Sequence, residues 1–198
     1  MNRDEFLRRF MLHPAPRIQR PKLHRMHPAA VLIPLVEREQ ELHVVLTQRS
    51  KYLRHHAGQI SFPGGRQEQH DANLLATALR EAHEEIGLAP EDVTIVGQLH
   101  DYPVLSNFIV RPFVALIEPQ QPFKLDQHEV AEIFTVPLAQ VLYQNRHYVY
   151  RLRRLLYDQV YFIPYQQRNI WGATAGMLRE LADHVYPERQ RIYRPLND

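Results

Sequence analysis

The sequence predicts an α/β (α+β) protein in which a mixed β-sheet is sandwiched between helices. The chain has 198 residues, enough for one domain with a hydrophobic core, and 44% of them are hydrophobic. Runs of strand-like composition are interspersed with a few stretches in which apolar residues recur at helical spacing. No segment repeats and none has low complexity. This pattern favours a single layered domain.

Helical periodicity predicts four helices, over residues 3–12, 72–86, 136–145 and 171–186. The second is the best marked. Asp71 is placed to cap its N-terminus, and Gly87 follows its last turn as a C-cap. The last of the four is long enough to cover one face of a sheet.

Strand-like runs occupy residues 29–39, 41–49, 92–99, 108–118, 147–153 and 158–165. A loop and short strand over residues 50–65 end in Pro63-Gly64-Gly65. We therefore divide the chain into an N-terminal helix with a proline-rich connector (1–28), a main domain (29–186) and a polar tail (187–198).

Composition excludes several classes of function. A formal net charge of +2 gives no general basis for binding nucleic acid. The absence of cysteine excludes disulfides, thiolate nucleophiles and Cys-ligated zinc. The first residues, MNRDEFLRRF, lack the apolar core of a secretory signal, and no run is long enough to span a bilayer. A cytoplasmic location is the expectation.

Three carboxylates crowd one face of the second predicted helix. Since a helix turns about 100° per residue, Glu85 lies about 40° to one side of Glu81 and Glu84 about 60° to the other. Like charges four residues apart destabilise a helix, and more so near its C-terminus. A hard divalent cation, Mg²⁺ or Mn²⁺, would remove that cost. The alternative is a solvated acidic face that pairs with Arg80.

The run Arg80-Glu81-Ala82-His83-Glu84-Glu85-Ile86-Gly87-Leu88 resembles the second half of the signature of the Nudix hydrolase family. The first half departs by one residue. The family spacing puts its glycine at position 66 and its acidic residue at position 72, whereas this chain has Gly65 and Asp71. The loop before the helix is therefore one residue longer.

The preceding segment narrows the resemblance. Leu46-Thr47-Gln48-Arg49-Ser50, then Leu53-Arg54, then Gly58 to Gly65, is similar to the upstream motif of the coenzyme A pyrophosphatase branch, which also has the longer loop. This resemblance implies a Nudix-like α/β/α sandwich around a mixed β-sheet. It also implies cleavage of coenzyme A or its thioesters to adenosine 3',5'-bisphosphate and a 4'-phosphopantetheine species.

The resemblance also implies roles for individual residues. Glu81 and Glu85 would be metal ligands, and Glu84 would be a third ligand or would position the attacking water. Arg80 would orient a glutamate through a charge-assisted hydrogen bond. The last residues of the upstream motif, Gly64 and Gly65, would turn the backbone tightly near the metal.

Other groups are candidates for the substrate and for the general base. Arg49 and Arg54 lie within the upstream motif and are expected to bind the phosphates of the substrate. Glu129 and Glu132 lie on a segment that could supply the base. Two ordinary acids at a helix start are an equal alternative for this pair.

Two further functions stay open. One is hydrolysis of another nucleoside diphosphate derivative by the same chemistry. The other is a non-catalytic Nudix module that senses a nucleotide, although such a module would be expected to lose its signature glutamates. The expected partner is a small-molecule diphosphate, with no nucleic acid or membrane, and the chain is expected to be a monomer or a homodimer.

Overall fold

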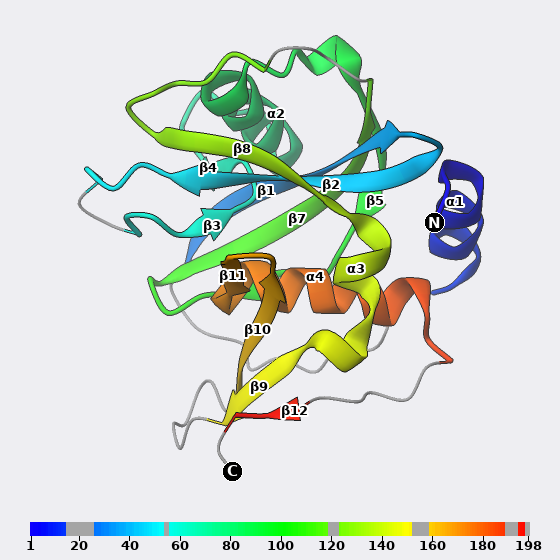
Figure 1. Cartoon of the computed structure of the whole chain (residues 1–198). Coiled ribbons are helices and arrows are strands. Elements are labelled where there is room, and N and C mark those ends of the chain that lie inside the picture. Colours follow the sequence, from blue (N-terminus) through cyan, green and yellow to red (C-terminus); the bar gives the residue numbers. More distant parts are fainter. Residues whose placement is uncertain (15–25, 54–55, 119–122, 152–158, 189–193, 197–198) are drawn as a thin grey trace.

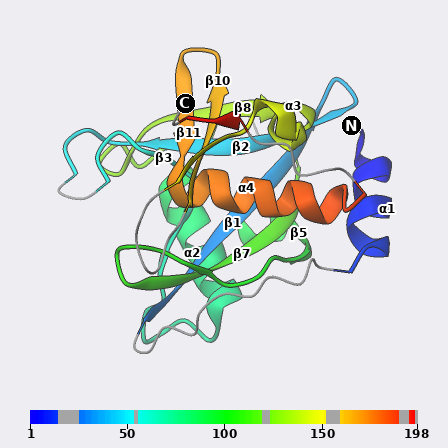
Figure 2. The same cartoon turned by 90° about the horizontal axis from the view of Figure 1, so that it is seen from below.

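The computed structural model describes the chain apart from residues 15–25, 54–55, 119–122, 152–158, 189–193 and 197–198. Within the described residues, an eight-stranded sheet lies between α2 (Leu74–Ile86) on one face and α4 (Gly172–Val185) on the other (Figure 1). Figure 2 shows α4 lying across the central strands. The predicted mixed sheet between helices is confirmed.

The central strand is β1 (His27–Arg38). It pairs in parallel with β7 (Phe108–Ile117) and antiparallel with β2 (Glu41–Arg49). Because side chains alternate along a strand, β1 serves two cores. Ile33 packs in the cluster that contains α4, and Leu32 packs in the cluster that contains α2. Burial on both faces explains the continuous apolar run of this strand.

Three of the other strands of the sheet are short, and they are β3 (Ile60–Ser61), β4 (Gly64–Arg66) and β6 (Tyr102–Pro103). The two longer ones are β5 (Val93–Gln98), which follows a 3₁₀ turn, η1 (Pro90–Asp92), and β8 (Val130–Pro137). The strand β8 pairs with β2 and was not among the predicted strands.

The position of β8 corrects two predictions. The helix predicted over residues 136–145 is shorter, because the strand runs on to Pro137 and α3 spans only Leu138–Leu142. A 3₁₀ turn, η2 (Gln144–Arg146), follows it. Proline lacks the N–H of a helix interior and is tolerated at a helix start, which fits the boundary here. The acids at 129 and 132 therefore do not begin a helix.

A second sheet packs below the first. Its four described strands follow the order β11-β10-β9-β12, and they are β9 (Tyr148–Arg151), β10 (Gln159–Tyr165), β11 (Arg168–Trp171) and β12 (Arg194–Pro195). The predicted strand over 147–153 extends beyond Arg151 into residues outside the described part of the chain. The sequence patterns located β9 and β10 but did not separate them from the main sheet.

The N-terminal helix, α1 (Arg3–Leu12), covers the core beside α4. Phe6 and Phe10 are buried in that core, and the Phe10 ring stacks on His184 of α4 at 4.3 Å between centroids. The predicted domain limits at residues 28 and 186 stay a prediction. In the described part of the chain, no helix has both the length and the apolar character needed to cross a membrane.

Candidate functional site

The helix α2 carries the acidic face and is fixed at both ends. Its N-cap is Asn73, whose side chain accepts a hydrogen bond from the Ala76 N–H at 2.9 Å. The prediction that Asp71 caps this helix is therefore wrong. The C-cap prediction is confirmed, because Gly87 adopts the left-handed conformation with φ 68°. Ala78, Ala82 and Ile86 bury the neighbouring face against the sheet.

Asp71 has a different position from the one predicted. Its carboxylate accepts two hydrogen bonds from Arg80, from Nε at 2.9 Å and from Nη2 at 3.0 Å. The Thr77 hydroxyl and the Glu68 N–H also donate to it. Arg80 first, and then these donors, hold the pKa of Asp71 well below its usual range. Its side chain is 2% exposed, so this carboxylate is a buried clamp for Arg80.

Arg80 in turn holds the glutamates. Its Nη1 donates to Glu81 Oε1 at 2.9 Å and to Glu84 Oε2 at 3.0 Å. The Glu81 side chain is largely buried, whereas that of Glu84 is 56% exposed. One arginine thus gathers three carboxylates, one of them from the loop before the helix.

Glu85 is the most deeply buried acid of the face. Its side chain is 3% exposed, Arg49 Nη1 lies 3.5 Å from its Oε1, and its Oε2 has no hydrogen-bond partner. Burial raises the pKa of Glu85 to about 8, although Arg49 opposes the rise. Burial also raises the pKa of Glu81. A buried carboxyl oxygen without a partner, such as Oε2 of Glu85, is costly without a cation.

The paired glycines bring backbone directly against the glutamates. A Cβ on Gly65 would lie 2.4 Å from Glu81 Oε1, and a Cβ on Gly64 would lie 2.4 Å from the Ala30 carbonyl oxygen. The strand β4 that contains them pairs antiparallel with β1. Only residues without a side chain fit between β1 and α2 here, which is the physical reason for the pair.

These residues fit a divalent cation. The unpaired Oε2 of Glu85 and the crowded carboxylate of Glu81 are hard oxygen donors. In the part of the chain that the structure describes, no three acidic or histidine side chains are already grouped as a metal site. Arg80 and Arg49 hold the carboxylates instead, so metal binding would require the carboxylates to exchange partners.

The two candidate bases lie in different surroundings. Glu129 is exposed in the turn before β8, and its charge contributes, after burial, to the raised pKa of Glu81 and of Glu85. Glu132 instead accepts a hydrogen bond from Arg168 Nη2 of β11 at 2.5 Å. Arg54 lies outside the described residues.

Comparison with known proteins identifies the family. A family model described as the NUDIX domain matches residues 26–158. The chain belongs to the Nudix family. Its glutamate face, α2 and the Gly64-Gly65 pair all fall within the match.

Curated Nudix relatives match most of the chain. A protein from Enterobacter sp. (strain 638), described as "Uncharacterized Nudix hydrolase NudL", is 43% identical over 180 residues, which is 90% of this chain and 92% of its own. A protein of the same description from Escherichia coli (strain SMS-3-5 / SECEC) has the same identity and coverage. The upstream motif and the Nudix residues therefore belong to one continuous homologous unit.

Solved structures agree on the fold. A MutT/nudix family protein from Enterococcus faecalis superposes with a TM-score of 0.52 at 15% identity, covering 96% of this chain and 71% of its own. A Nudix hydrolase from M. smegmatis, RenU, gives a TM-score of 0.50 at 23% identity, covering 59% of this chain and 73% of its own. At such identities the likeness concerns the Nudix fold alone.

Proposed function

We propose that this Nudix hydrolase cleaves the diphosphate of coenzyme A or a coenzyme A thioester in the presence of Mg²⁺ or Mn²⁺. The products would be adenosine 3',5'-bisphosphate and 4'-phosphopantetheine or its acyl derivative. The observation that carries the proposal is the pair of buried carboxylates, Glu81 and Glu85, with Arg49 beside them.

Glu81 and Glu85 would hold the divalent ion, with Glu84 as a third ligand or as the group that positions the attacking water. When bound, the ion would neutralise the diphosphate and lower the pKa of a bound water. Gly65 leaves the space in which the Glu81 carboxylate lies. The Gly64 backbone hydrogen bond favours the ionised form of Glu85, which is the form a metal ligand needs.

The arginines have separate roles in this proposal. Arg80 keeps Glu81 and Glu84 oriented, and Asp71 prevents it from turning toward solvent. Arg49 is 3.5 Å from Glu85, and a cation bound by that carboxylate would free the guanidinium from this pairing. The guanidinium would then be available to bind a diphosphate through two parallel hydrogen bonds. Arg54 is the second proposed phosphate ligand.

Glu129 is the general base that we favour. It is exposed, and it lies close enough to Glu81 and Glu85 to affect their pKa values. A base must reach the water that attacks phosphorus, and an exposed carboxylate in a turn can do so. The ion pair of Glu132 with Arg168 argues for a structural role for that residue.

The upstream motif supports coenzyme A over other diphosphates. It contains Arg49 and the glycine pair, and both contact the glutamates of α2. A motif that meets the metal ligands directly is well placed to select the substrate. Another nucleoside diphosphate derivative remains the second candidate, because the diphosphate chemistry would be the same.

The test is product analysis by mass spectrometry after incubation with coenzyme A and either Mg²⁺ or Mn²⁺. We expect both products from the wild type and at least a hundredfold loss of rate in Glu85→Gln. Glu91→Gln, an exposed carboxylate outside the site, is the matched control and should keep the rate.

The other outcomes separate the alternatives. Turnover of a different diphosphate, with coenzyme A untouched, would retain the chemistry and reject the substrate. No turnover of any diphosphate with either metal would favour a nucleotide-sensing module.

A further inference from the structure

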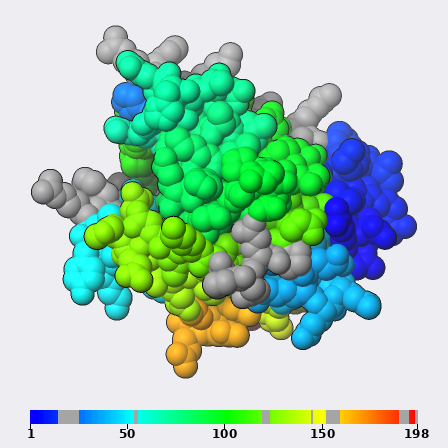
Figure 3. Space-filling view, turned by 90° about the horizontal axis from the view of Figure 1, so that it is seen from above, coloured from blue at the N-terminus to red at the C-terminus, as the bar shows by residue number. Residues whose placement is uncertain are grey.

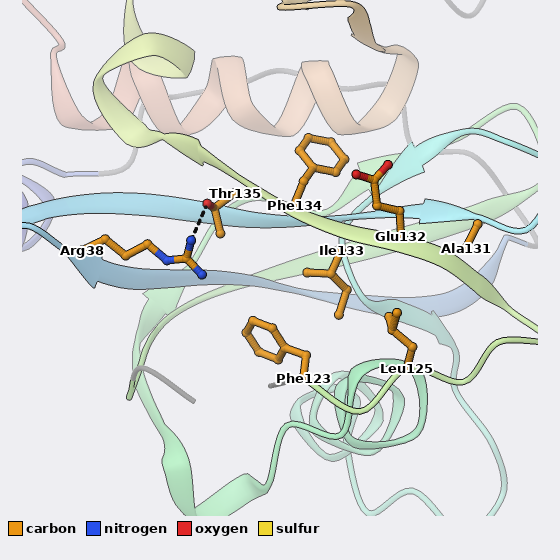
Figure 4. Close-up of a pocket in the computed structure, with 8 residues that line it drawn as sticks. All are labelled: Arg38, Phe123, Leu125, Ala131, Glu132, Ile133, Phe134 and Thr135. Carbon is orange, nitrogen blue, oxygen red and sulfur yellow. Dashed lines mark hydrogen bonds between the residues drawn. The ribbon is translucent and has the colours of Figure 1, made fainter. Parts of the chain in front are cut away.

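A groove of about 350 Å³ runs along the face of β8 that is turned toward α2 (Figure 4). Ile133 points into it from the strand, and Phe123 and Leu125 form the facing wall from the loop before β8. Ala131 and Thr135 line its two ends. At the Thr135 end, Arg38 Nη1 donates to the threonine hydroxyl at 3.3 Å.

The facing wall of this groove is tied to the C-terminal turn of α2. The Asp126 N–H donates to the Glu85 carbonyl at 3.1 Å, which ties the facing wall to the end of the helix. Ala131 lies two residues along the chain from Glu129, about 7 Å on an extended strand. Figure 3 shows the yellow-green atoms of this part of the chain bordering the green atoms of α2.

The groove combines apolar walls with polar groups at its ends. Its volume falls within the range of small-molecule pockets, and five of its eight lining residues are apolar, with Glu132 beside Ala131 at one end and Arg38 and Thr135 at the other. The wall residue Phe123 is packed against the same core as α2, so the wall is anchored. A ligand that leaves the diphosphate site along β8 would pass from carboxylates over apolar side chains to hydrogen-bond donors.

We propose that the groove binds the pantetheine arm of the substrate. This inference rests on the proposed function, and it deepens it by assigning the group that distinguishes coenzyme A from other diphosphates. The branched dimethyl and methylene groups would contact Phe123, Leu125 and Ile133. The two amide groups would lie along the middle of the groove, and the thiol end of the arm would lie nearest to Thr135 and Arg38.

The lengths agree. The backbone of the arm, about fourteen atoms, is as long as about five extended residues, or roughly 16 Å. From Glu129 to Thr135 the chain advances about 20 Å at the rise of a strand. The arm would therefore reach most of the way to Arg38, with its sulfur in the last third of the groove.

The first test measures substrate preference after the groove is blocked. We compare kcat/KM for coenzyme A with kcat/KM for the methyl ester of 3'-phosphoadenosine 5'-diphosphate, which keeps every phosphate and lacks the arm. Ala131→Trp should lower the wild-type preference for coenzyme A at least fivefold, mainly through KM. Ala139→Trp, an exposed alanine of α3, is the matched control and should keep the preference. An unchanged preference in Ala131→Trp would overturn the proposal.

The second test needs neither turnover nor a variant. Methyl NMR of the metal-free wild type, titrated with 4'-phosphopantetheine, should shift the signals of Leu125 and Ile133. Ile163, buried in the core on the α4 side, should not shift. Absence of shifts at Leu125 and Ile133 would reject the groove. If these signals shift but coenzyme A is not cleaved, the proposed function fails and the groove stands.

Discussion

Arg80 of α2 donates to both carboxylate oxygens of Asp71, at 2.9 and 3.0 Å, and Asp71 lies in the loop that precedes this helix. This ion pair fixes the position of Arg80, which in turn orients two glutamates of the acidic face. With Nε and Nη2 engaged by Asp71, only Nη1 reaches Glu81 and Glu84. The geometry of two candidate metal ligands is thereby tied to a residue outside the helix.

Asp71→Asn should weaken both stability and activity. The side chain is buried, and an asparagine amide has one acceptor oxygen in place of two, so it loses one of the two hydrogen bonds from Arg80. We therefore expect a loss of about 2–4 kcal/mol in the free energy of unfolding. Urea unfolding measures this, and Asp4→Asn, exposed on α1, serves as the control. A loss of activity of at least tenfold should remain at temperatures where the variant is folded. Full activity there would contradict a positioning role.

The stability of the metal-free protein should fall as pH rises toward 8. Burial raises the pKa of Glu85 from 4.5 to about 8, so the folded state keeps a proton that the unfolded state releases. The stabilisation is present in full below about pH 4.5 and is lost as pH passes about 8. Urea midpoints between pH 5 and 8, in the presence of a chelator, measure the slope.

Glu85→Gln is the matched control for this titration. The amide is similar in shape and has no charge to gain, so the slope between pH 5 and 8 should be smaller than in the wild type. Equal slopes in the two proteins would show that another group titrates in this window.

The two glycines of β4 should respond differently to alanine. At Gly65 the new Cβ meets the end of the Glu81 side chain, which can move, so the fold should survive and activity should fall at least tenfold. At Gly64 it meets the backbone of Ala30 and Val31, which cannot move without shifting β1. Gly64→Ala should therefore lower the melting temperature more than Gly65→Ala. The reverse order would refute this account.

The N-terminal helix should contribute to stability through its aromatic face. Phe6 is fully buried, and Phe6→Ala should cost about 3–5 kcal/mol in the free energy of unfolding. Leu12, which is 74% exposed on the same helix, should change it by less than about 0.5 kcal/mol when replaced by alanine. Similar effects at the two positions would mean that α1 is not docked in solution.

Local patterns in the sequence predicted the parts of the site that are local. The shared face of Glu81, Glu84 and Glu85 follows from helix geometry, and the C-cap follows from a glycine after an apolar run. Asp71 escaped prediction because an acid just before a helix usually caps it. Here the extra loop residue leaves capping to Asn73 and turns Asp71 back toward Arg80.

Contacts between distant segments were beyond the sequence patterns. The strand β8 has apolar and polar residues in an order that fits no simple period. Its antiparallel pairing with β2 depends on how the intervening chain folds back to the sheet. The approach of Arg49 to Glu85 likewise joins a strand to a helix that begins 25 residues later. Such distances are set by packing of the whole domain rather than by neighbours in the chain.

The parallel pairing of β1 with β7 constrains the order in which the chain can fold. His27 pairs with Phe108 and Val36 with Ile117, so the central strand gains this neighbour only after the loop, α2 and β5 have been synthesised. The hairpin of β1 and β2 can form early, because its partners are adjacent. Closing so long a loop is slow, because the chain loses conformational entropy before the strand pairing can stabilise it. Until then the apolar edge of β1 is exposed, and this interval is when the nascent chain is most prone to aggregate.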